Sequence, residues 1–396
     1  MKKFCNANVY VEGEGIKRTD LYFDEKIVCI GKSCGENCGK ACGEKPAEAA
    51  AAEEIAVPEG AVVLPAFIDT HVHGAGGSDA MDGTEEALFT VAKTLAADGT
   101  ATFLATTMTQ SPENIKKALS AVKTYREKNC DEGAYIYGVH LEGPFIAEKF
   151  KGAQPLEYVA APSVEVFREY QEASGNCIRT VTLAPEKDGA EELIQELKET
   201  GVNASVGHTS AKFADIENAV KAGAVGITHT YNAQSPLHHR DIGTVGAALL
   251  LDELQTEIIA DTIHVSVPAI KLLVKNKPKE KITLITDAMR AKGMPDGESE
   301  LGGQKVFVKN GEARLADGTL AGSVLKMNVA VKNMTEKVGL PFTEAVDFAT
   351  KNPARMMGLS ETKGSIKVGK DADFVILDKD FNVLKNIRAG KVIYER

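Results

Sequence analysis

The sequence predicts an α/β protein: a closed (β/α)8 barrel of the TIM type with a small β-sandwich domain formed by both chain termini. Three observations lead to this expectation. Apolar runs alternate with helical stretches along the centre of the chain, and short alternating runs occupy both ends. The length of 396 residues also exceeds the ~250 residues of a typical barrel alone.

Eight apolar runs rich in β-branched residues mark the expected barrel strands. They cover residues 62–68, 101–106, 135–140, 179–184, 203–207, 226–229, 257–261 and 282–286. Strands that are apolar on both faces are typical of a buried parallel sheet. Eight repeats favour a closed barrel. An open sheet would require a glycine-rich phosphate loop after the first strand, and GAGGSDAMDG follows a His-x-His pair instead.

Helices with a 3.6-residue apolar periodicity are expected between these runs. They cover residues 84–97, 112–128, 164–173, 191–200, 213–222 and 267–275. Several begin at a residue type that caps helix N-termini, namely Thr84, Ser111 and Ser266.

The two ends of the chain contain shorter alternating runs, such as 7–12 and 26–30, with turns expected at Gly369, 378–380 and Gly390. Neither end is long enough to bury a core alone. We therefore expect residues 1–61 and 358–396 to form one β-sandwich domain, and residues 62–357 to form the barrel. Two independent additions at the edge of the barrel remain the alternative.

The charge balance excludes some classes of partner. Lysine and arginine number 46 and aspartate and glutamate 56, which leaves a formal net charge of −10. Nucleic acids and anionic membranes both need a basic surface, so neither is an expected partner. No run approaches the ~18 apolar residues that span a bilayer. The start MKKFCNANVYVEGEG has no apolar segment typical of a secretory signal, and a cytoplasmic location is expected.

Seven cysteines are present, and Cys29, Cys34, Cys38 and Cys42 crowd one glycine-rich stretch. In a long acidic chain without a signal segment they do not indicate a disulfide framework. An opportunistic metal or redox site is the alternative, but no histidine lies within the stretch. A reduced surface loop is the favoured interpretation, and no role is assigned.

Histidines and carboxylates recur where the predicted strands end. The eight histidines are residues 71, 73, 140, 208, 229, 238, 239 and 264. In a closed barrel all carboxyl ends of strands face one mouth, where active sites are built. His71 and His73 are two residues apart, so both point to one side of an extended segment.

These residue types suit a catalytic metal site. Glu142 offers a hard oxygen, and His208 and His229 offer two more nitrogens, a donor set that suits Zn²⁺, Fe²⁺, Mn²⁺ or Co²⁺. A two-metal site bridged by Glu142 and a site with one ion both remain open. Asp287 follows the eighth run, where it can take a proton from a metal-bound water and later return it to a leaving group.

The sequence resembles the N-acetylglucosamine-6-phosphate deacetylases of the amidohydrolase superfamily over nearly its whole length. The motifs are PAFIDTHVHG, HLEGPF, GHTSA, THTYNAQSPLHHR, ADTIHV, ITDAM and TLAGS. The resemblance implies Glu142, His208 and His229 as central metal ligands, His71 and His73 as a second-metal pair, and Asp287 as catalytic acid/base. It implies a substrate-binding set of Ala153, Gln154, Asn232, Ala233, Arg240, Asp261, His264, Leu320, Ala321 and Gly322.

Two of these positions carry further expectations. Arg240 matches a phosphate-pairing arginine that reaches across from the neighbouring subunit of the family's dimer. Gln154 stands where many relatives have a histidine near the scissile carbonyl, and glutamine can donate a hydrogen bond there but cannot carry a proton.

The expected reaction is metal-dependent deacetylation of N-acetylglucosamine 6-phosphate to glucosamine 6-phosphate and acetate. Metal-bound hydroxide attacks and Asp287 is the general acid/base. A divalent transition metal is expected, zinc or iron, with one or two ions per subunit of a homodimer. The alternatives are the same chemistry on N-acetylgalactosamine 6-phosphate, a hydantoinase- or dihydroorotase-like enzyme, and a barrel without activity. The second alternative is disfavoured because Glu142 occupies the place of the carboxylated lysine that such enzymes often need.

Overall fold

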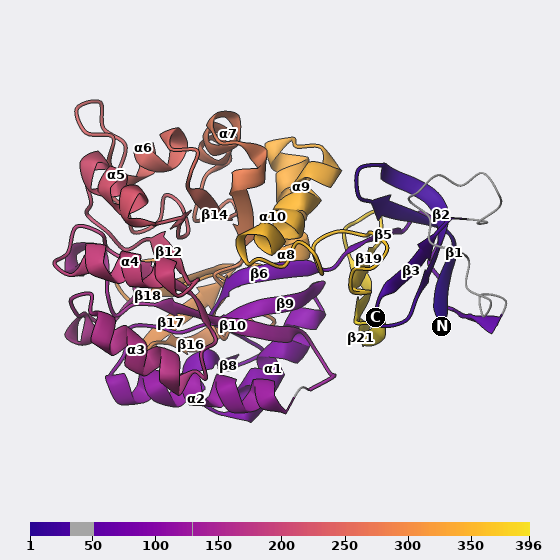
Figure 1. Cartoon of the computed structure of the whole chain (residues 1–396), viewed down its shortest axis with the longest axis horizontal. Helices are drawn as coiled ribbons and strands as arrows, with labels where there is room; N and C mark the ends of the chain where they lie inside the picture. The colour runs from indigo at the N-terminus through magenta and orange to yellow at the C-terminus, as the bar shows by residue number, and fades with distance from the viewer. Residues whose placement is uncertain (32–50, 129) are drawn as a thin grey trace.

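The computed structural model describes residues 1–31, 51–128 and 130–396. Figure 1 shows a barrel surrounded by helices, with a smaller sheet beside it that contains both chain termini. Cys34, Cys38 and Cys42 lie outside the described residues, whereas Cys29 is buried in the smaller sheet.

Eight parallel strands form the barrel in the order β15-β14-β13-β12-β11-β10-β9-β6. Their bounds are β6 (Phe67–Val72), β9 (Thr100–Thr106), β10 (Tyr135–Glu142), β11 (Ile178–Leu183), β12 (Asn203–Val206), β13 (Gly226–Ile227), β14 (Gln255–Ile259) and β15 (Ile282–Ile285). The barrel closes just after β15, where the Asp287 amide donates to the His71 carbonyl over 2.8 Å. The predicted fold class is confirmed.

The first predicted run needs a correction, because residues 62–68 contain two strands of different sheets. β5 (Val62–Pro65) pairs with β1 and β19 of the terminal sheet, and β6 begins the barrel two residues later. Both strands are largely buried, so no polar residue marks the crossing between the sheets. The domain limits themselves stay a prediction.

Ten α-helices occur in the described part of the chain. They are α1 (Glu85–Ala96), α2 (Pro112–Glu127), α3 (Val164–Ala173), α4 (Ala190–Glu199), α5 (Phe213–Ala222), α6 (Gly243–Leu250), α7 (Val267–Asn276), α8 (Met327–Asn333), α9 (Phe342–Ala349) and α10 (Lys351–Met356). Thr84 and Ser111 cap α1 and α2 with their hydroxyls, as predicted. Ser266 precedes α7 without such a bond.

Short helical turns complete the barrel connections. They are the 3₁₀ turns η2 (Ala80–Asp82), η3 (Glu148–Phe150), η4 (Leu156–Tyr158) and η5 (Lys279–Lys281), and the π-helical turn η6 (Met334–Val338).

The terminal sheet joins strands from both ends of the chain in the order β21-β20-β19-β5-β1-β2-β3, with β4 also paired to β1. Besides β5, its strands are β1 (Lys2–Val11), β2 (Gly15–Phe23), β3 (Ile27–Ile30), β4 (Glu53–Glu54), β19 (Phe374–Leu377), β20 (Val383–Arg388) and β21 (Lys391–Glu395). The rings of Phe4, Phe23 and Phe374 pack with centroids 5.0–5.4 Å apart. This shared cluster means that the two ends form one sheet rather than two separate additions.

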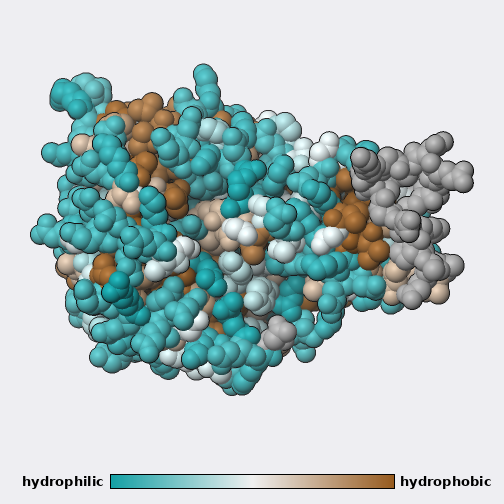
Figure 2. Space-filling model, in the orientation of Figure 1, coloured by the Kyte–Doolittle hydropathy of each residue, from teal (hydrophilic) through white to brown (hydrophobic). Residues whose placement is uncertain are grey.

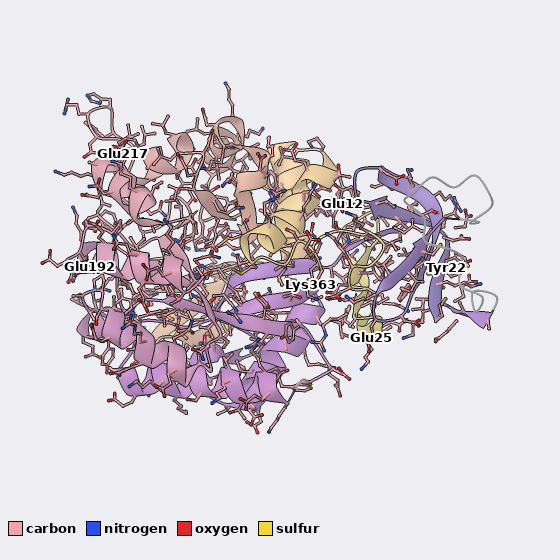
Figure 3. All side chains as sticks on the ribbon, viewed as in Figure 1. Glu12, Tyr22, Glu25, Glu192, Glu217 and Lys363 are labelled. Atoms are coloured by element: carbon pink, nitrogen blue, oxygen red, sulfur yellow. The ribbon has the colours of Figure 1, made fainter. Side chains whose placement is uncertain are left out.

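Lys363 lies between the barrel and the terminal sheet (Figure 3). Its Nζ lies 2.6 Å from Asp373 Oδ2 and 3.0 Å from Asp371 Oδ2. Burial opposes the charge of Lys363, but the two carboxylates outweigh it and raise the pKa of this lysine. The segment that enters β19 is thus held by a largely buried ion-pair cluster.

Two smaller sheets lie outside the predicted pattern. One contains β16 (Gly297–Leu301), β17 (Gln304–Lys309) and β18 (Glu312–Leu315), and the other pairs β7 (Gly74–Ala75) with β8 (Ser78–Asp79). The sequence did contain a signal for the first, since Asn310–Gly311 between two alternating runs is a hairpin signature.

The face drawn in Figure 2 is mostly hydrophilic, with smaller apolar patches. Among the described residues, no helix combines the length and the apolar character needed to cross a membrane.

Candidate active site and metal centre

A cavity of about 340 Å³ opens where the barrel strands end. His73, Glu142, His208, His229 and Asp287 all line it. Each follows or ends a different barrel strand, so the closed parallel barrel brings together residues that are far apart in sequence. This convergence was predicted from the strand-end positions.

The backbone after three barrel strands turns sharply to aim side chains at the cavity. His208, His229 and Asp287 have φ values of 47°, 31° and 47°. This left-handed conformation costs a residue with a Cβ roughly 1–2 kcal/mol, so the surrounding structure must hold it. Two backbone hydrogen bonds hold Asp287 in this conformation. Its amide donates to the His71 carbonyl, and its carbonyl accepts from the Ser323 amide over 2.8 Å.

Glu142, His208 and His229 form the tightest group of the site. Glu142 Oε1 lies 3.2 Å from His208 Nε2 and 3.0 Å from His229 Nε2, and the two ring nitrogens are 3.1 Å apart. All three side chains are almost fully buried. Three potential ligand atoms therefore face one small volume.

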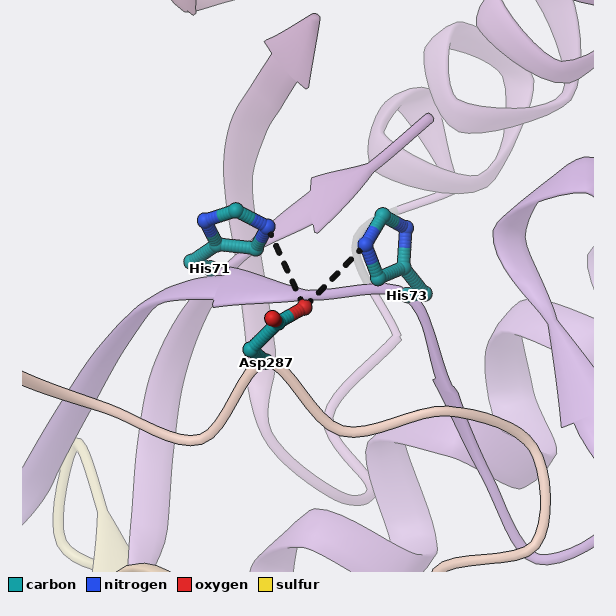
Figure 4. A group of neighbouring side chains, drawn as sticks. All are labelled: His71, His73 and Asp287. Atoms are coloured by element: carbon teal, nitrogen blue, oxygen red, sulfur yellow. Dashed lines mark ion pairs between the residues drawn. The ribbon is translucent and has the colours of Figure 1, made fainter. Parts of the chain in front are cut away.

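A second group lies next to the first and contains His71, His73 and Asp287 (Figure 4). Asp287 Oδ1 lies 3.4 Å from His71 Nε2 and 3.3 Å from His73 Nε2. The two imidazoles also lie 3.5 and 3.3 Å from the oxygens of Glu142. Glu142 thus faces both groups, as a bridging carboxylate would.

Burial and opposite charges shift the pKa values of this centre strongly. Burial opposes charge on the imidazoles, but Glu142 and Asp287 outweigh it and raise the pKa of His71 well above its usual range and that of His73 to about 9. Burial would likewise raise the pKa of Asp287, yet His71 and His73 lower it to about 2. The centre therefore needs positive charge among its carboxylates, whether from protons or from a cation.

The donor set fits a divalent cation. His208 Nδ1 donates to the Phe150 carbonyl over 2.8 Å, which leaves Nε2, the nitrogen that faces His229 Nε2 and Glu142, as the potential ligand atom of this ring. His71 Nε2 is buried without a hydrogen-bond partner. Atoms that converge in this way need a proton or a cation between them, and mixed imidazole and carboxylate ligands suit a transition metal.

Comparison with known proteins agrees with this geometry. Residues 62–393 match the amidohydrolase family. The chain belongs to the amidohydrolase family. It is 45% identical over 344 residues to the N-acetylglucosamine-6-phosphate deacetylase of Bacillus subtilis, which covers 86% of this chain and 87% of the relative. These matches identify the chain as a hydrolase.

Solved structures of other amidohydrolases superpose on nearly the whole chain. The N-acetylglucosamine-6-phosphate deacetylase of Pasteurella multocida is 30% identical and covers 99% of both chains with a TM-score of 0.89. A mutant deacetylase from Mycobacterium smegmatis, in complex with N-acetyl-D-glucosamine-6-phosphate, is 31% identical and covers 99% of both chains with a TM-score of 0.88.

Most of the residues predicted to bind substrate line the cavity of this amidohydrolase, and their role in binding stays a prediction. The cavity is lined by Ala153, Gln154, Asn232, Ala233, His264, Leu320 and Gly322. Ala321 and Asp261 are not among the lining residues. Ala321 is fully buried beneath its neighbours, and Asp261 holds His264, with 2.6 Å between its Oδ2 and His264 Nδ1.

Arg240 does not line the cavity of its own chain. It lies on an exposed loop, where its guanidinium is 2.9 Å from His239 Nε2. The loop precedes α6, and the exposed guanidinium is free to meet a second copy of the chain, as the predicted role requires. Its predicted role stays a prediction.

Gln154 makes different contacts from those expected. Its Nε2 donates to Glu142 Oε2 over 2.8 Å, and its Oε1 accepts from the Thr109 amide over 2.7 Å. One amide hydrogen and the oxygen are therefore already engaged. The second amide hydrogen remains to serve the predicted contact with a carbonyl oxygen.

Several lining residues escaped the sequence analysis, namely Met108, Lys149, Phe150, Gly152, Leu301 and Thr319. They lie on the loop after β9, in and just after the turn η3, and in or next to the β16–β18 sheet, all of them outside the predicted barrel strands and helices. Thr319 directly precedes the predicted LAG segment and could have been included on that ground.

His140 is buried beneath the site because β10 continues two residues beyond the predicted strand end. Its Nδ1 donates to the Thr70 carbonyl over 3.1 Å, and its Nε2 accepts from the Thr182 hydroxyl over 2.7 Å. Burial, followed by the charge of His71, lowers the pKa of His140 to about 4. His140 is therefore a neutral scaffold residue whose lone pair is already used.

Proposed function

We propose that this amidohydrolase removes the acetyl group of N-acetylglucosamine 6-phosphate, giving glucosamine 6-phosphate and acetate. The observation that carries the proposal is the convergence of Glu142, His208, His229 and Asp287 on one cavity. The names of the relatives, including one determined with this sugar phosphate, support the choice of substrate.

The proposed cofactor is a divalent transition ion, zinc or iron, with one or two ions per subunit. Glu142, His208 and His229 would hold the first ion, and His71 and His73 offer a second place beside Asp287. When bound, such an ion polarises a carbonyl oxygen and lowers the pKa of water from ~15.7 toward ~7.

Asp287 moves the proton in this scheme. It reaches the cavity, and its pKa of about 2 keeps it ionised, so its carboxylate can accept a proton from the attacking water. The protonated acid then donates to the amine nitrogen, because an unprotonated amine is a poor leaving group. Proton transfer of this kind contributes roughly 10²–10⁴-fold to the rate.

His264 is placed to hold the substrate's carbonyl or hydroxyl groups. Asp261 accepts from its Nδ1, and both side chains are largely buried. Burial opposes charge on His264, but Asp261 outweighs it and raises the pKa of this imidazole. A protonated His264 can donate from Nε2 to a substrate oxygen while Asp261 keeps the ring in place.

The phosphate needs cationic groups, and the cavity of one chain supplies few. Among its described lining residues, Lys149 is the one lysine or arginine. We therefore propose a homodimer in which Arg240 of each chain pairs with the phosphate in its neighbour, since arginine binds phosphate through two parallel hydrogen bonds. The cytoplasmic location likewise stays a prediction.

Acetate release from purified protein tests the proposal. The panel contains N-acetylglucosamine 6-phosphate, N-acetylgalactosamine 6-phosphate and unphosphorylated N-acetylglucosamine, with the metal content measured on the same preparation. We expect the highest kcat/KM on the first sugar. A higher kcat/KM on N-acetylgalactosamine 6-phosphate would make that sugar the assigned substrate. Failure to release acetate from any of the three sugars would overturn the proposed function.

A further inference from the structure

Glu257 is a buried carboxylate behind the metal centre that the proposed chemistry does not use. It lies in the middle of β14, is 1% exposed, and does not line the cavity. Its Oε2 lies 3.3 Å from His71 Nδ1, and its Oε1 accepts from the Thr70 hydroxyl over 3.1 Å. Both oxygens are therefore directed at the strand that carries the His-x-His pair.

This contact decides which nitrogen of His71 carries the proton. A carboxylate can only accept, so Nδ1 must be the protonated nitrogen when it bonds to Glu257. Nε2 of the neutral ring is then a free lone pair, and it faces Glu142 Oε1 and Asp287 Oδ1 at 3.5 and 3.4 Å. When a cation displaces the proton from Nε2, the contact with Glu257 thus keeps the remaining proton of His71 on Nδ1.

The other ring nitrogens of the centre have weaker support. His208 Nδ1 donates to a neutral carbonyl, and Nδ1 of His73 and of His229 are buried without a partner. Among the four described imidazoles of the centre, His71 is the one whose Nδ1 contacts a carboxylate. His140 packs on His71 with ring centroids 4.4 Å apart, but both of its nitrogens are engaged elsewhere.

We propose that Glu257 is a positioning residue that makes His71 a ligand for a second divalent ion, beside the ion held by Glu142, His208 and His229. This inference rests on the proposed metal-dependent function. A carboxylate that accepts from the far nitrogen of a metal-binding histidine fixes the orientation of the ring and raises its basicity.

Titration of the metal-free protein with Zn²⁺ tests this inference, with bound zinc counted by elemental analysis. We expect two ions per chain in the wild type. Glu257→Gln keeps the shape of the side chain but lets it donate as well as accept. This variant is expected to bind the first ion as the wild type does and to bind the second ion with about 10–100-fold lower affinity.

Two further variants separate positioning from packing. Glu257→Asp retains the charge and is expected to recover part of the affinity for the second ion. Ser205→Ala is the matched control, because its hydroxyl is buried in the same barrel and bonds to Thr228 rather than to the centre. It is expected to bind both ions as the wild type does. Titration with Co²⁺ adds a spectroscopic readout, since its visible absorption depends on the ligands.

Three results would overturn the inference: a wild type that binds one ion at saturating zinc, a Glu257→Gln variant with two ions at unchanged affinity, or equal loss of both ions. If Glu257→Gln does not fold, Thr70→Val removes the hydroxyl that orients Glu257 and is expected to weaken the second ion selectively. A Thr70→Val variant that binds both ions with wild-type affinity would then contradict the inference. Failure to release acetate from any sugar would contradict the proposed function but not these ion counts.

Discussion

Gln154 and Glu142 are joined by a hydrogen bond of 2.8 Å, from the amide Nε2 to the carboxylate Oε2. The other oxygen of Glu142 faces His208 and His229. Gln154 is itself held by the Thr109 amide. The loop after β9 therefore fixes, through one glutamine, the rotation of the carboxylate that faces both metal groups.

Replacement of this glutamine should weaken the centre. Gln154→Ala leaves the buried Thr109 amide unpaired, which costs about 1–3 kcal/mol, and it leaves Glu142 Oε2 with His73 as its remaining partner. We expect a lower free energy of unfolding in urea and a higher Kd for zinc. Gln304→Ala is the matched control, because Gln304 bonds to the neighbouring Ala153 carbonyl without touching Glu142. Equal effects of the two substitutions would contradict this interpretation.

Asp287→Asn should abolish proton transfer while the first ion remains bound. The amide keeps the size of the side chain but cannot accept a proton, so kcat is expected to fall about 10²–10⁴-fold. Elemental analysis of the variant checks that zinc is retained at Glu142, His208 and His229. Turnover close to that of the wild type would remove Asp287 from the mechanism.

Removal of the metal should lower both activity and thermal stability. An ion that binds the folded chain alone stabilises it by about 2.7 kcal/mol when free metal exceeds Kd a hundredfold. We expect a chelator to lower Tm, and zinc to restore Tm and acetate release together. In His229→Ala, which lacks a central ligand, zinc should raise Tm much less. The same Tm with and without chelator in the wild type would argue against a bound ion.

The affinity for zinc should rise with pH. In the ion-free protein the pKa of His73 is raised to about 9, so its ring is protonated at neutral pH, and zinc must displace that proton. The apparent affinity should therefore increase from pH 6.5 to about 9, and binding should release protons. The ion pairs of charged His73 also stabilise the ion-free fold. That contribution is complete below the unfolded pKa of ~6.5 and is lost as pH rises through 9. Calorimetric titrations in buffers of different ionisation enthalpy measure the proton release, and a pH-independent affinity would contradict it.

Arg240→Ala tests the phosphate contact between subunits. A charge-assisted hydrogen bond contributes about 1.5–3 kcal/mol, so KM for the phosphorylated sugar should rise about 10–100-fold with little change in kcat. The exposed Arg18 on the terminal sheet offers a control, because Arg18→Ala removes the same charge from β2, outside the residues that line the cavity. Sedimentation shows whether the chain is a dimer. An unchanged KM in Arg240→Ala would remove this arginine from the substrate site.

The barrel could be predicted because its strands are apolar on both faces and its helices carry a clear periodicity. The apolar character of the strands also hid the boundary at Pro65, because the single apolar run 62–68 contains one strand of the terminal sheet and the start of a barrel strand. Helix α6 escaped prediction because its sequence GTVGAALL has two glycines and no polar face.

The site could be predicted as far as it depends on strand ends. Glu142, His208, His229 and Asp287 converge because every strand of a parallel barrel ends at the same mouth. Glu257 could not be assigned this way, since β14 begins at Gln255 rather than at the expected residue 257. A single carboxylate within an apolar strand was nonetheless a signal, because a buried charge requires a partner.

The position of β5 between β1 and β19 has a consequence for biosynthesis. Phe4 and Phe23 are synthesised long before Phe374, whose ring packs on both of them. Strands β1 and β2 must therefore leave the ribosome without this partner and wait until the whole barrel sequence has been translated. A nascent chain should therefore engage chaperones through β1 and β2 until β19 is released.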